Sequence, residues 1–492
     1  MFQIPKKIVF IIIAIILFLV IISFFDRALA IGIFLLFLLT GITLLILSRV
    51  GVKDKVLIFL FLITLLIHLF ATLFVHYAHF YPFGGGEGDQ EKYHRAAIEL
   101  SQRFRQGDFS IEGFGGAFPK LYVDHYYPVI LGGIYALTLP EMITGKLLNV
   151  WLVAISVVLF YLIVIEIGGS KKNAFFGGLL VVIYPSYLYY GSLLLREGFV
   201  ISVALFSILF TIKLIKKFSW RRFLVFYIGL GLLVHFRFYI GYAFFPAFLI
   251  SIPFISNLNL KKKIIYGIII IILLGFLPQI FSNQGYYGIN SFKLFFNSGM
   301  VTYFREVAYN YIPPYLLNQF SSQPSPQTVP AQSPNAPSPP PLSAPQSFSS
   351  GTGSTKILKT DFNKPLTFIK EYFDSFINVF LGPFPWQIKY SRQLFILLET
   401  IPWYFILFFI VRGVISLARS KKIKFALPLI IFSFTALAVT ALFMASNFGV
   451  YSRIRIPAFV SLLCLADFNV GILYYISSFL SKVKFFKFFN DK

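Results

Sequence analysis

The sequence predicts an all-α protein that crosses a membrane about twelve times, with further interfacial helices in two long outer loops. Three observations lead to this prediction. Of the 492 residues, 58% are hydrophobic and 13% are charged, whereas soluble domains usually have about 45–50% and about 25%. Many uninterrupted apolar runs reach the length of roughly 18 residues that indicates a membrane span. Basic residues collect in every second loop between these runs, as the positive-inside rule describes.

The predicted spans follow the apolar runs in order along the chain. The first run resembles a signal peptide, but no small-residue cleavage site follows it, so we expect a retained anchor. The weakest run is 222–235, because it is shorter than the roughly 20 residues that cross about 30 Å of hydrocarbon. In approximate bounds the predicted spans are 8–24, 29–48, 56–76, 143–165, 174–191, 198–216, 222–235, 238–255, 264–281, 395–417, 423–445 and 454–478.

The lysines and arginines between the spans indicate orientation. Loops with basic clusters face the cytoplasm, and one path of about twelve spans satisfies every cluster with both termini on the cytoplasmic side of the cell membrane. The net charge of +24 is therefore mainly a topology signal and gives no support to a nucleic-acid partner. The clusters are Lys6 and Lys7; Arg49 to Lys55; Lys171 and Lys172; Lys213 to Arg222; Lys261 to Lys263; Arg419 to Lys424; and Lys482 to Lys492.

This topology divides the chain into four regions. Residues 1–55 form an N-terminal two-helix extension, and residues 56–281 form a transmembrane core that includes the first outer loop, 77–142. Residues 282–394 form the second outer loop, and residues 395–492 hold the C-terminal transmembrane helices. Because both loops lie outside the membrane, we look for the functional residues there.

The second outer loop contains a segment that cannot fold by itself. Residues 323–355 are rich in Pro, Ser, Gln and Ala and carry no charge, so this segment is predicted to be a disordered tether. On its two sides, 301–319 and 366–386 mix aromatic residues with scattered charges. This mixture is typical of helices that lie in the membrane interface.

The first outer loop starts with four glycines among acidic residues. Tyr93, Ala96, Ala97 and Leu100 then recur at helical spacing, so we expect a short helix on the bilayer with Asp89 as its N-cap. Capping alone would explain Asp89, and a catalytic role is the alternative. The stretch in question is Gly84-Gly85-Gly86-Glu87-Gly88-Asp89-Gln90-Glu91-Lys92-Tyr93-His94-Arg95-Ala96-Ala97.

A second acidic and aromatic patch follows in the same loop. It contains Asp124 and His125 and precedes a short apolar stretch, 129–139, with two glycines. We expect this stretch to be an interfacial or re-entrant helix, because a span here would place every later lysine cluster outside. The patch reads Tyr122-Val123-Asp124-His125-Tyr126-Tyr127-Pro128.

The order of these motifs resembles that of the C-type (GT-C) integral-membrane glycosyltransferases, which include protein mannosyltransferases and lipid A aminoarabinose transferases. The resemblance covers about 56–255 and 395–478, and two additional spans before the acidic loop depart from the family pattern. The subfamily and the acceptor therefore stay open. The motifs that carry the resemblance are Gly88-Asp89 with the following Tyr93; Tyr127-Pro128 to Leu139; Lys146 to Gly169; Tyr184-Pro185; Ser192 to Glu197; and Tyr451-Ser452-Arg453-Ile454-Arg455-Ile456-Pro457.

The resemblance implies transfer of a sugar from a polyprenyl-phosphate-linked donor to a glycan, lipid or protein acceptor on the outer face of the membrane. It also implies that Asp89 is the base or orients the acceptor. Displacement at an anomeric carbon needs one carboxylate near the acceptor proton and positive charge at the leaving phosphate. Glu197 is the second catalytic candidate, and the acceptor-binding candidates are Tyr93, His94, Asp124 and His125.

Four arginines at outer span ends are candidates for phosphate binding. Lysine-rich topology signals are not expected on this side, and the planar guanidinium suits two phosphate oxygens. We hypothesise that Arg453 and Arg455 hold the donor phosphate, and that Arg237 or Arg196 assists. Contact of these side chains with lipid headgroups is the alternative.

A metal ion is compatible with the acids of the outer loops, but no spacing requires one. Asp89, Glu87 and Asp124 are the oxygen donors that would hold Mg²⁺ or Mn²⁺. The single cysteine, Cys464, excludes an intrachain disulfide and a cysteine metal cluster. Asp467 lies inside the last predicted span, where its neighbour Asn469 favours a structural hydrogen-bond site over a proton relay.

Two other functions fit the sequence less well. A polysaccharide polymerase or ligase of the O-antigen type would depend on late arginines more than on Asp89. A lipid-sugar flippase or transporter would place charges near the membrane midplane and often shows repeated halves. The predicted spans carry few charges and no internal repeat is visible, which favours the transferase.

Overall fold

The structure is a computed structural model that describes residues 6–52, 54–81, 87–109, 126–255, 258–275, 297–307, 364–388 and 394–469. Every regular element in these ranges is a helix, as expected for a chain whose apolar runs need internally satisfied backbone groups in lipid. The prediction of an all-α membrane protein is confirmed. The predicted disordered segment, 323–355, lies outside the described residues.

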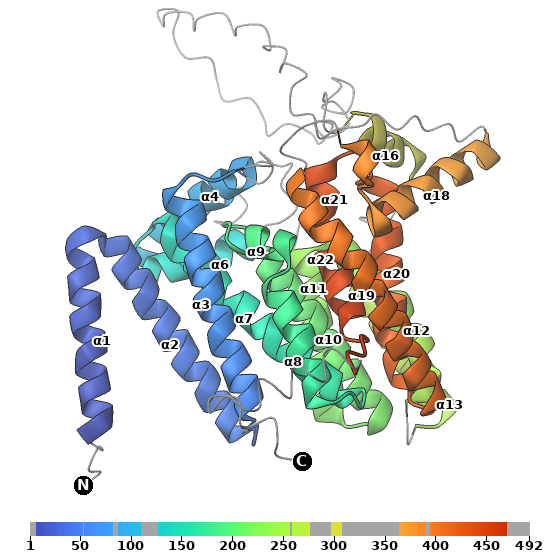
Figure 1. Cartoon of the computed structure of the whole chain (residues 1–492), viewed down its shortest axis with the longest axis horizontal. Coiled ribbons are helices and arrows are strands. Elements are labelled where there is room, and N and C mark those ends of the chain that lie inside the picture. Colours follow the sequence, from blue (N-terminus) through green and yellow to red (C-terminus); the bar gives the residue numbers. More distant parts are fainter. Residues whose placement is uncertain are drawn as a thin grey trace, which may run out of the picture.

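Long helices run side by side and form a bundle (Figure 1). Six of those described are long and apolar enough to cross a membrane, or seven if the bent pair α8 and α9 forms one span. The larger number of about twelve stays a prediction. The helices of the bundle are α1 (Lys6–Phe25), α2 (Arg27–Arg49), α3 (Lys55–Tyr77), α7 (Met142–Glu166), α8 (Lys171–Val182), α9 (Pro185–Gly191), α10 (Glu197–Lys216), α11 (Trp220–Phe236), α12 (Phe238–Ser251), α13 (Leu260–Gly275), α19 (Leu394–Arg419) and α20 (Ile423–Phe443).

Apolar side chains cover the outside of this bundle as well as its core. Phe70 of α3 and Phe405 of α19 are 64% and 69% exposed, while α7 and α10 are largely buried. Exposed phenylalanines on long apolar helices are expected where lipid replaces water as the solvent. The outer helices α1, α2, α3 and α19 therefore present the lipid-facing surface.

Polar side chains at the helix ends fix where several helices begin. The side chain of Asp26 accepts a hydrogen bond from Leu29 N at 2.9 Å, and that of Asp54 accepts one from Val56 N at 3.0 Å. Such N-caps satisfy backbone donors that have no partner inside the helix. The caps therefore separate α1, α2 and α3 at defined residues within an almost continuous apolar sequence.

The predicted span 174–191 is broken in the middle. Helices α8 and α9 meet at an angle of 59°, because Pro185 opens α9 and cannot continue the hydrogen-bond ladder of α8. The Nε2 atom of His68 on α3 lies 3.1 Å from Val182 O at the end of α8. This contact satisfies a carbonyl that the break would otherwise leave without a partner.

The last predicted span is not one continuous helix. The described part contains α21 (Phe448–Ile454) and α22 (Ile456–Leu463), after which residues 464–469 leave the helical conformation. The prediction of a helix over 454–478 is therefore wrong for 464–469. Here the backbone bonds to neighbouring helices instead, because Asp467 N donates to Phe409 O at 3.0 Å. Asp467 also pairs with Arg412 at 3.4 Å and accepts from Asn173 at 3.1 Å, as a structural hydrogen-bond site would.

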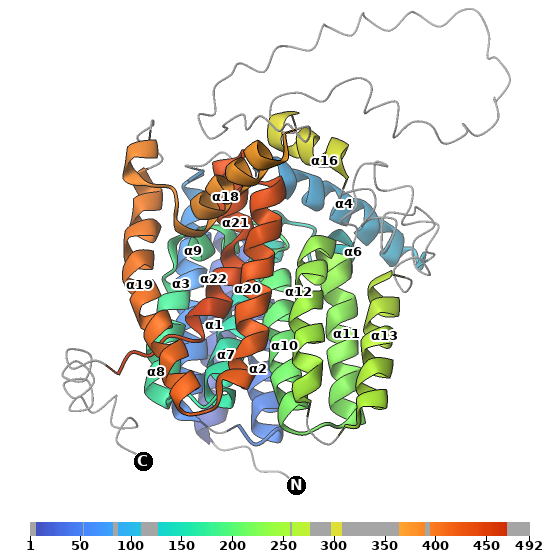
Figure 2. The same cartoon turned by 90° about the vertical axis from the view of Figure 1, so that its right-hand side faces the viewer.

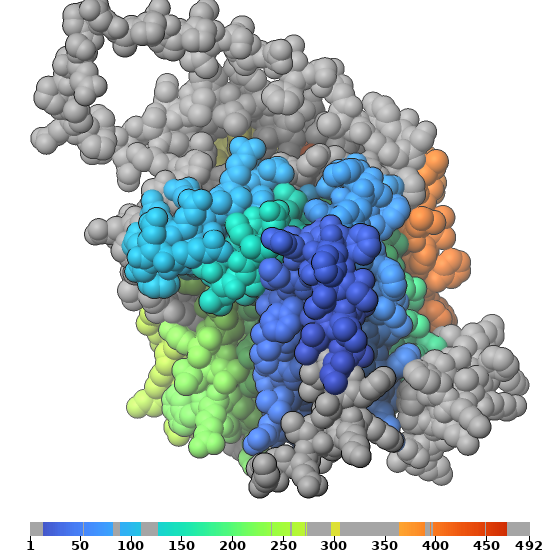
Figure 3. Space-filling view, turned by 90° about the vertical axis from the view of Figure 1, so that its left-hand side faces the viewer, coloured from blue at the N-terminus to red at the C-terminus, as the bar shows by residue number. Residues whose placement is uncertain are grey.

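Helices from the two predicted outer loops lie at one end of the bundle, which we call the α4 end. These helices are α4 (Glu87–Arg105), α6 (Tyr126–Leu137), α16 (Ser298–Thr302), the π-helical turn η2 (Tyr303–Val307) and α18 (Pro365–Leu381). Figure 2 shows α4, α16 and α18 together at this end. In Figure 3, α1 lies on the outside of the bundle and α4 covers part of its upper end.

The start of α4 differs from the prediction. The helix begins at Glu87, so Asp89 lies inside its first turn and is not the N-cap. An N-cap residue lies just outside the helix, whereas Glu87 and Gly88 are already helical. Capping therefore does not explain Asp89, although a carboxylate in the first turn still suits the positive end of the helix dipole.

Helix α4 is held by close packing on α6. A Cβ atom on Gly132 of α6 would lie 2.7 Å from Leu100 Cβ and 3.3 Å from Ala97 O of α4. A Cβ atom on the next residue, Gly133, would meet nothing within 4 Å. The glycine at 132 thus allows α4 to approach α6 closely.

We predict that Gly132→Ala pushes α4 away from α6 and destabilises the protein by about 1–3 kcal/mol, the usual cost of overpacking. Gly133→Ala is the matched control, because it adds the same methyl group in open space and gains about 1 kcal/mol in helix propensity. Thermal unfolding in detergent should show a lower midpoint for Gly132→Ala alone. Equal midpoints for the two variants would contradict this account.

Candidate active site

Two acids and two arginines from separate parts of the chain meet at the α4 end. Asp89 lies in the first turn of α4, and Glu197 is the first residue of α10. Arg237 lies between α11 and α12, and Arg453 lies in α21. Asp89 and Arg453 are 364 residues apart in the sequence. Only the packing of the helices brings the four side chains together.

The four side chains form one continuous network of ion pairs. Arg453 Nη1 lies 3.0 Å from Asp89 Oδ2, and Arg453 Nε lies 3.1 Å from Glu197 Oε1. Arg237 Nη2 donates to the same Glu197 oxygen at 2.6 Å. Arg453 is therefore shared by both catalytic candidates, while Glu197 is shared by two arginines.

The loop before Glu197 is held by buried amides. Asn149 of α7 donates to Leu193 O at 2.6 Å and to Leu195 O at 2.7 Å. Gln90 of α4 accepts from Leu194 N at 2.9 Å. These bonds satisfy the polar backbone of a buried loop, and they fix α4, which carries Asp89, to the segment that carries Glu197.

Arg196 lies in the same region as the network. It is 8% exposed, and its Nη1 donates to Phe236 O at 3.1 Å, next to Arg237. The charge of Arg196 helps to lower the pKa of Asp89. Of the four arginines predicted from the sequence, the structure therefore brings together Arg196, Arg237 and Arg453.

Tyr93 and His94 point from α4 toward α6. Tyr93 is buried and packs edge-to-face on Tyr127, with ring centroids 5.2 Å apart. His94 Nδ1 lies 3.0 Å from the Tyr135 hydroxyl. Burial lowers the pKa of His94, partly offset by the charges of Glu91 and Glu141. A neutral imidazole is therefore the form at neutral pH.

Three predicted site residues are only partly or not at all within the described structure. Asp124 and His125 lie outside the described residues, and so does the side chain of Glu87. In the parts of the chain that are described, no three His, Cys, Asp or Glu side chains gather closely enough to hold a metal ion. Asp89, the described member of the proposed metal set, already faces Arg453, so the divalent cation stays a prediction.

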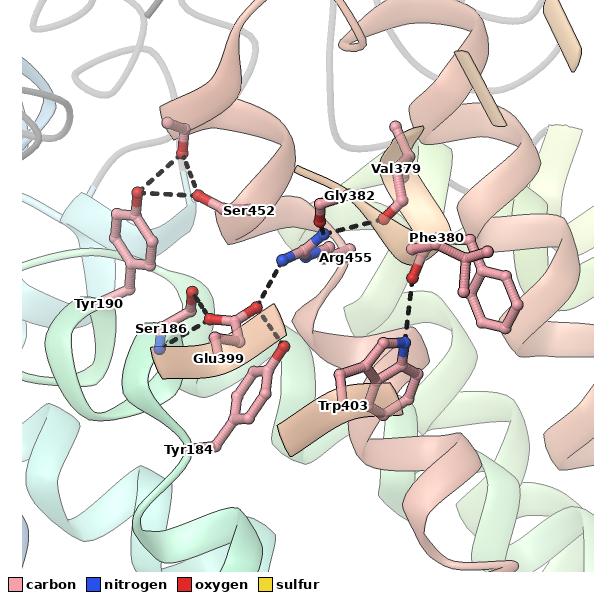
Figure 4. Close-up of polar contacts among 12 residues, drawn as sticks. Tyr184, Ser186, Tyr190, Val379, Phe380, Gly382, Glu399, Trp403, Ser452 and Arg455 are labelled. Atoms are coloured by element: carbon pink, nitrogen blue, oxygen red, sulfur yellow. Dashed lines mark hydrogen bonds and ion pairs between the residues drawn. The ribbon is translucent and has the colours of Figure 1, made fainter. Parts of the chain in front are cut away.

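Arg455 belongs to a second cluster, which Figure 4 shows. Arg455 Nη2 lies 2.6 Å from Glu399 Oε1, and both side chains are 1% exposed. Arg455 Nη1 donates to Val379 O at 3.0 Å and to Gly382 O at 2.6 Å. The two terminal nitrogens of Arg455 are therefore occupied by a carboxylate and by the end of α18.

Glu399 connects this cluster to the bent span. Its Oε2 accepts from Ser186 N at 3.1 Å and from the Ser186 hydroxyl, and its Oε1 accepts from the Tyr184 hydroxyl. Ser186 lies in the first turn of α9, where backbone donors lack partners inside the helix. A buried carboxylate there both caps α9 and neutralises Arg455 (Figure 4).

The sequence analysis did not identify Glu399, Gln90, Asn149 or Lys146 as site residues. Glu399 is an acid inside a predicted span, and a charge there indicates a buried partner. Lys146 gave the same signal, because it lies in the predicted span 143–165. The structure buries it fully near the start of α7, with its Nζ 3.4 Å from His76 Nδ1. Gln90 and Asn149 gave no such signal, because neutral amides are common in surface loops and helices alike.

The electrostatic environment of Asp89 favours its charged form. Burial tends to raise the pKa of this carboxyl, but the charge and hydrogen bond of Arg453, with Arg196 and Lys92, bring it below the ordinary value of 3.8. A carboxyl whose pKa is lower in the folded state stabilises the protein above its unfolded pKa. That stability is lost as the pH falls through the folded pKa.

We predict that the stability contributed by the Asp89 carboxylate falls as the pH is lowered. The stability difference between the wild type and Asp89→Asn should stay constant from about pH 7 to about pH 4 and shrink below it. Thermal unfolding of both proteins over this pH range measures the difference. A gap that closes already at about pH 5 to 6 would show that burial outweighs Arg453.

We predict that Glu399→Gln strongly destabilises the protein, because it leaves Arg455 buried without a counter-charge, at a cost of about 3–5 kcal/mol. Glu166→Gln is the control, since Glu166 pairs with Lys216 at 3.0 Å in a partly exposed position that should contribute less than about 1 kcal/mol. Unfolding midpoints in detergent test this. Similar losses in both variants would refute it.

A comparison with known protein families matches part of the chain. Residues 127–281 match the family model described as "Dolichyl-phosphate-mannose-protein mannosyltransferase". This segment contains Arg196, Glu197 and Arg237, whereas Asp89 and Arg453 lie outside it. No curated protein and no solved structure matches the chain significantly. Residues 127–281 are therefore similar to a mannosyltransferase family of the GT-C superfamily, and the apolar helices indicate a multi-pass membrane protein.

Proposed function

We propose that this protein transfers a sugar from a polyprenyl-phosphate-linked donor to an acceptor on the outer face of the cytoplasmic membrane. The observation that carries the proposal is the position of Arg453, within 3.0 Å of Asp89 and 3.1 Å of Glu197. A base for the acceptor and a cation for the leaving phosphate are the two groups that this reaction needs. Both belong to one network at the α4 end.

The basic loops support the proposed side of the membrane. Lys171 begins α8, Lys213 and Lys216 end α10, and Arg419 ends α19. Each of these residues lies at the end of its helix that is opposite to the α4 end. By the positive-inside rule these ends face the cytoplasm. The α4 end then faces outward, and both termini lie inside.

In the proposed reaction, the acceptor oxygen forms a bond to the anomeric carbon as the bond from that carbon to the phosphate oxygen breaks. The bonding electrons leave with the phosphate, which is released as polyprenyl phosphate. The acceptor proton passes to Asp89, which acts as the base or orients the acceptor. A single displacement of this kind inverts the anomeric centre and needs no carboxylate nucleophile.

The arginines have separate roles in this scheme. Arg453, with Arg237 and Arg196, is proposed to hold the donor phosphate, because guanidinium groups bind phosphate oxygens in pairs. Glu197 keeps two of these arginines in position from the first residue of α10. Arg455, whose two terminal nitrogens already bind Glu399 and two carbonyls, is proposed to support Arg453 without contacting the phosphate.

The acceptor side is proposed to include Tyr93, His94, Asp124 and His125. The first two lie on α4, one helical turn from Asp89, and the others immediately precede α6, which packs on α4. Their chemistry suits hydroxyl groups of a glycan, lipid or protein acceptor. A divalent cation, Mg²⁺ or Mn²⁺, would supply further positive charge for the phosphate if Asp89, Glu87 and Asp124 converge.

The placement of buried charge supports an enzyme over a lipid-sugar flippase. Among the described residues, the fully buried ion pairs are Glu197 with Arg237 and Glu399 with Arg455. They lie at helix starts, where α10 and α19 begin, whereas transporters gather such groups at the midplane between repeated halves. An O-antigen-type polymerase or ligase would instead depend on Arg453 and Arg455 and would tolerate loss of Asp89.

We predict that Asp89→Asn lowers the turnover number by about 10²- to 10⁴-fold, the usual contribution of a general base. Glu99→Gln is the matched control, because Glu99 lies on the same helix in a half-exposed pair with Arg103 at 3.8 Å. The assay follows loss of a surface glycan in cells and transfer from a lipid-linked sugar by purified protein. Full activity of Asp89→Asn would favour the polymerase.

A further inference from the structure

We propose that the donor phosphate and the Asp89 carboxylate bind Arg453 in turn. On this proposal, which rests on the proposed function, the lipid phosphate displaces Asp89 from Arg453 Nη1. Asp89 then becomes available to the acceptor only when the donor is in place. Three features of the network support this exchange: unequal burial of the two acids, polar atoms without partners, and conservation of charge.

The two carboxylates that hold Arg453 differ in accessibility. The side chain of Glu197 is 2% exposed, whereas that of Asp89 is 34% exposed and that of Arg453 is 12% exposed. A ligand that approaches Arg453 from the accessible side therefore meets Asp89 first. An ion pair with an exposed partner is also held less strongly than a buried one.

The buried partner is fixed in place by a second arginine. Arg237 Nη2 donates to Glu197 Oε1 at 2.6 Å, and both side chains are 2% exposed. Because Glu197 starts α10 and is paired with Arg237, it keeps its position if Asp89 leaves. Arg453 then retains one carboxylate partner throughout the exchange and never becomes an uncompensated buried charge.

Several buried polar atoms of the network have no hydrogen-bond partner among the described residues. These atoms include Arg237 Nε and Glu197 Oε2, and Arg453 Nε lies near Glu197 without the alignment of a hydrogen bond. Buried polar atoms in proteins are nearly always satisfied. Phosphate oxygens would supply acceptors for arginine donors, and a sugar hydroxyl would supply a donor for the free glutamate oxygen.

The exchange leaves the charge of the anion that Arg453 binds on its accessible side unchanged. Three arginines, Arg196, Arg237 and Arg453, face two carboxylates, Asp89 and Glu197, so the cluster already carries an excess positive charge. A sugar phosphodiester bears one negative charge, as a carboxylate does. Replacing Asp89 by the donor therefore creates no new buried charge, and the released phosphate monoester, with a charge near −1.5 to −2, is neutralised better still.

The test measures binding of a short prenyl phosphate, farnesyl phosphate, to the purified full-length protein in detergent. If Asp89 competes for Arg453, Asp89→Asn should bind this probe about tenfold more tightly than the wild type, because hydrogen bonds to charged groups are worth that much. Arg453→Gln should lose most of the binding. If Asp89→Asn does not fold, Asp89→Ser tests the same competition.

Two controls identify the origin of any gain. Farnesol, which lacks the phosphate, should bind the wild type and Asp89→Asn equally, and Glu99→Gln should bind farnesyl phosphate as the wild type does. A gain that extends to farnesol would overturn the proposal, because it would indicate looser packing. Equal or weaker binding of farnesyl phosphate by Asp89→Asn would overturn it directly.

Competition experiments distinguish the source of the phosphate. Inorganic phosphate and phosphatidylglycerol vesicles should compete poorly with farnesyl phosphate if the site takes a prenyl phosphate. Effective competition by phosphatidylglycerol would make it a headgroup site and overturn the assignment. Failure of sugar transfer with the predicted gain in binding would reject only the proposed function, whereas transfer without that gain would reject only the exchange.

Discussion

Glu399 is a buried carboxylate that holds three separate parts of the chain together. It pairs with Arg455 at 2.6 Å and accepts hydrogen bonds from Ser186 and Tyr184 at the start of α9. Through Arg455 the same cluster reaches the last carbonyls of α18. A charge in a membrane protein is costly without a partner inside the protein, and the loss of either partner leaves the other exposed to that cost. The positions of α9, α18 and α22 therefore depend on one ion pair.

The candidate active site depends on this arrangement from both sides. Arg453 lies two residues before Arg455, and Glu197 lies one short loop after α9, so both take their positions from segments that Glu399 connects. Asp89 arrives independently on α4, which Gln90 fixes to the same loop. Buried ionisable groups thus have two roles in this protein. The pair of Glu399 with Arg455 holds the helices together, and the arginines of the neighbouring network are proposed to bind the donor phosphate.

The sequence alone was sufficient for the membrane class and for most helix bounds, and it selected Asp89, Glu197, Arg237 and Arg453 as candidates before their contacts were known. Apolar length predicts helices reliably, because lipid leaves the backbone no other partner. The predicted spans 29–48, 143–165 and 423–445 agree with α2, α7 and α20 within a few residues. The prediction of a helix was wrong for residues 464–469. There the backbone N–H groups of Asp467 and Phe468 donate to Phe409 O and to the Asn173 side chain instead of to a regular helix.

Sequence by itself also separated two kinds of charge. The lysines between the spans indicate orientation, because the charge bias acts on each loop locally. The scarce acids and arginines of the other loops remained as candidates for the site. Only the tertiary structure decided which of these candidates meet. Arg453 and Arg455 are equivalent in the sequence, two residues apart in one motif, yet one lies between Asp89 and Glu197 and the other pairs with Glu399. Arg455 joins α21 to α22 with helical backbone angles, so residues two apart point to different sides. Which partners lie on each side depends on the packing of distant helices, and no local pattern encodes that.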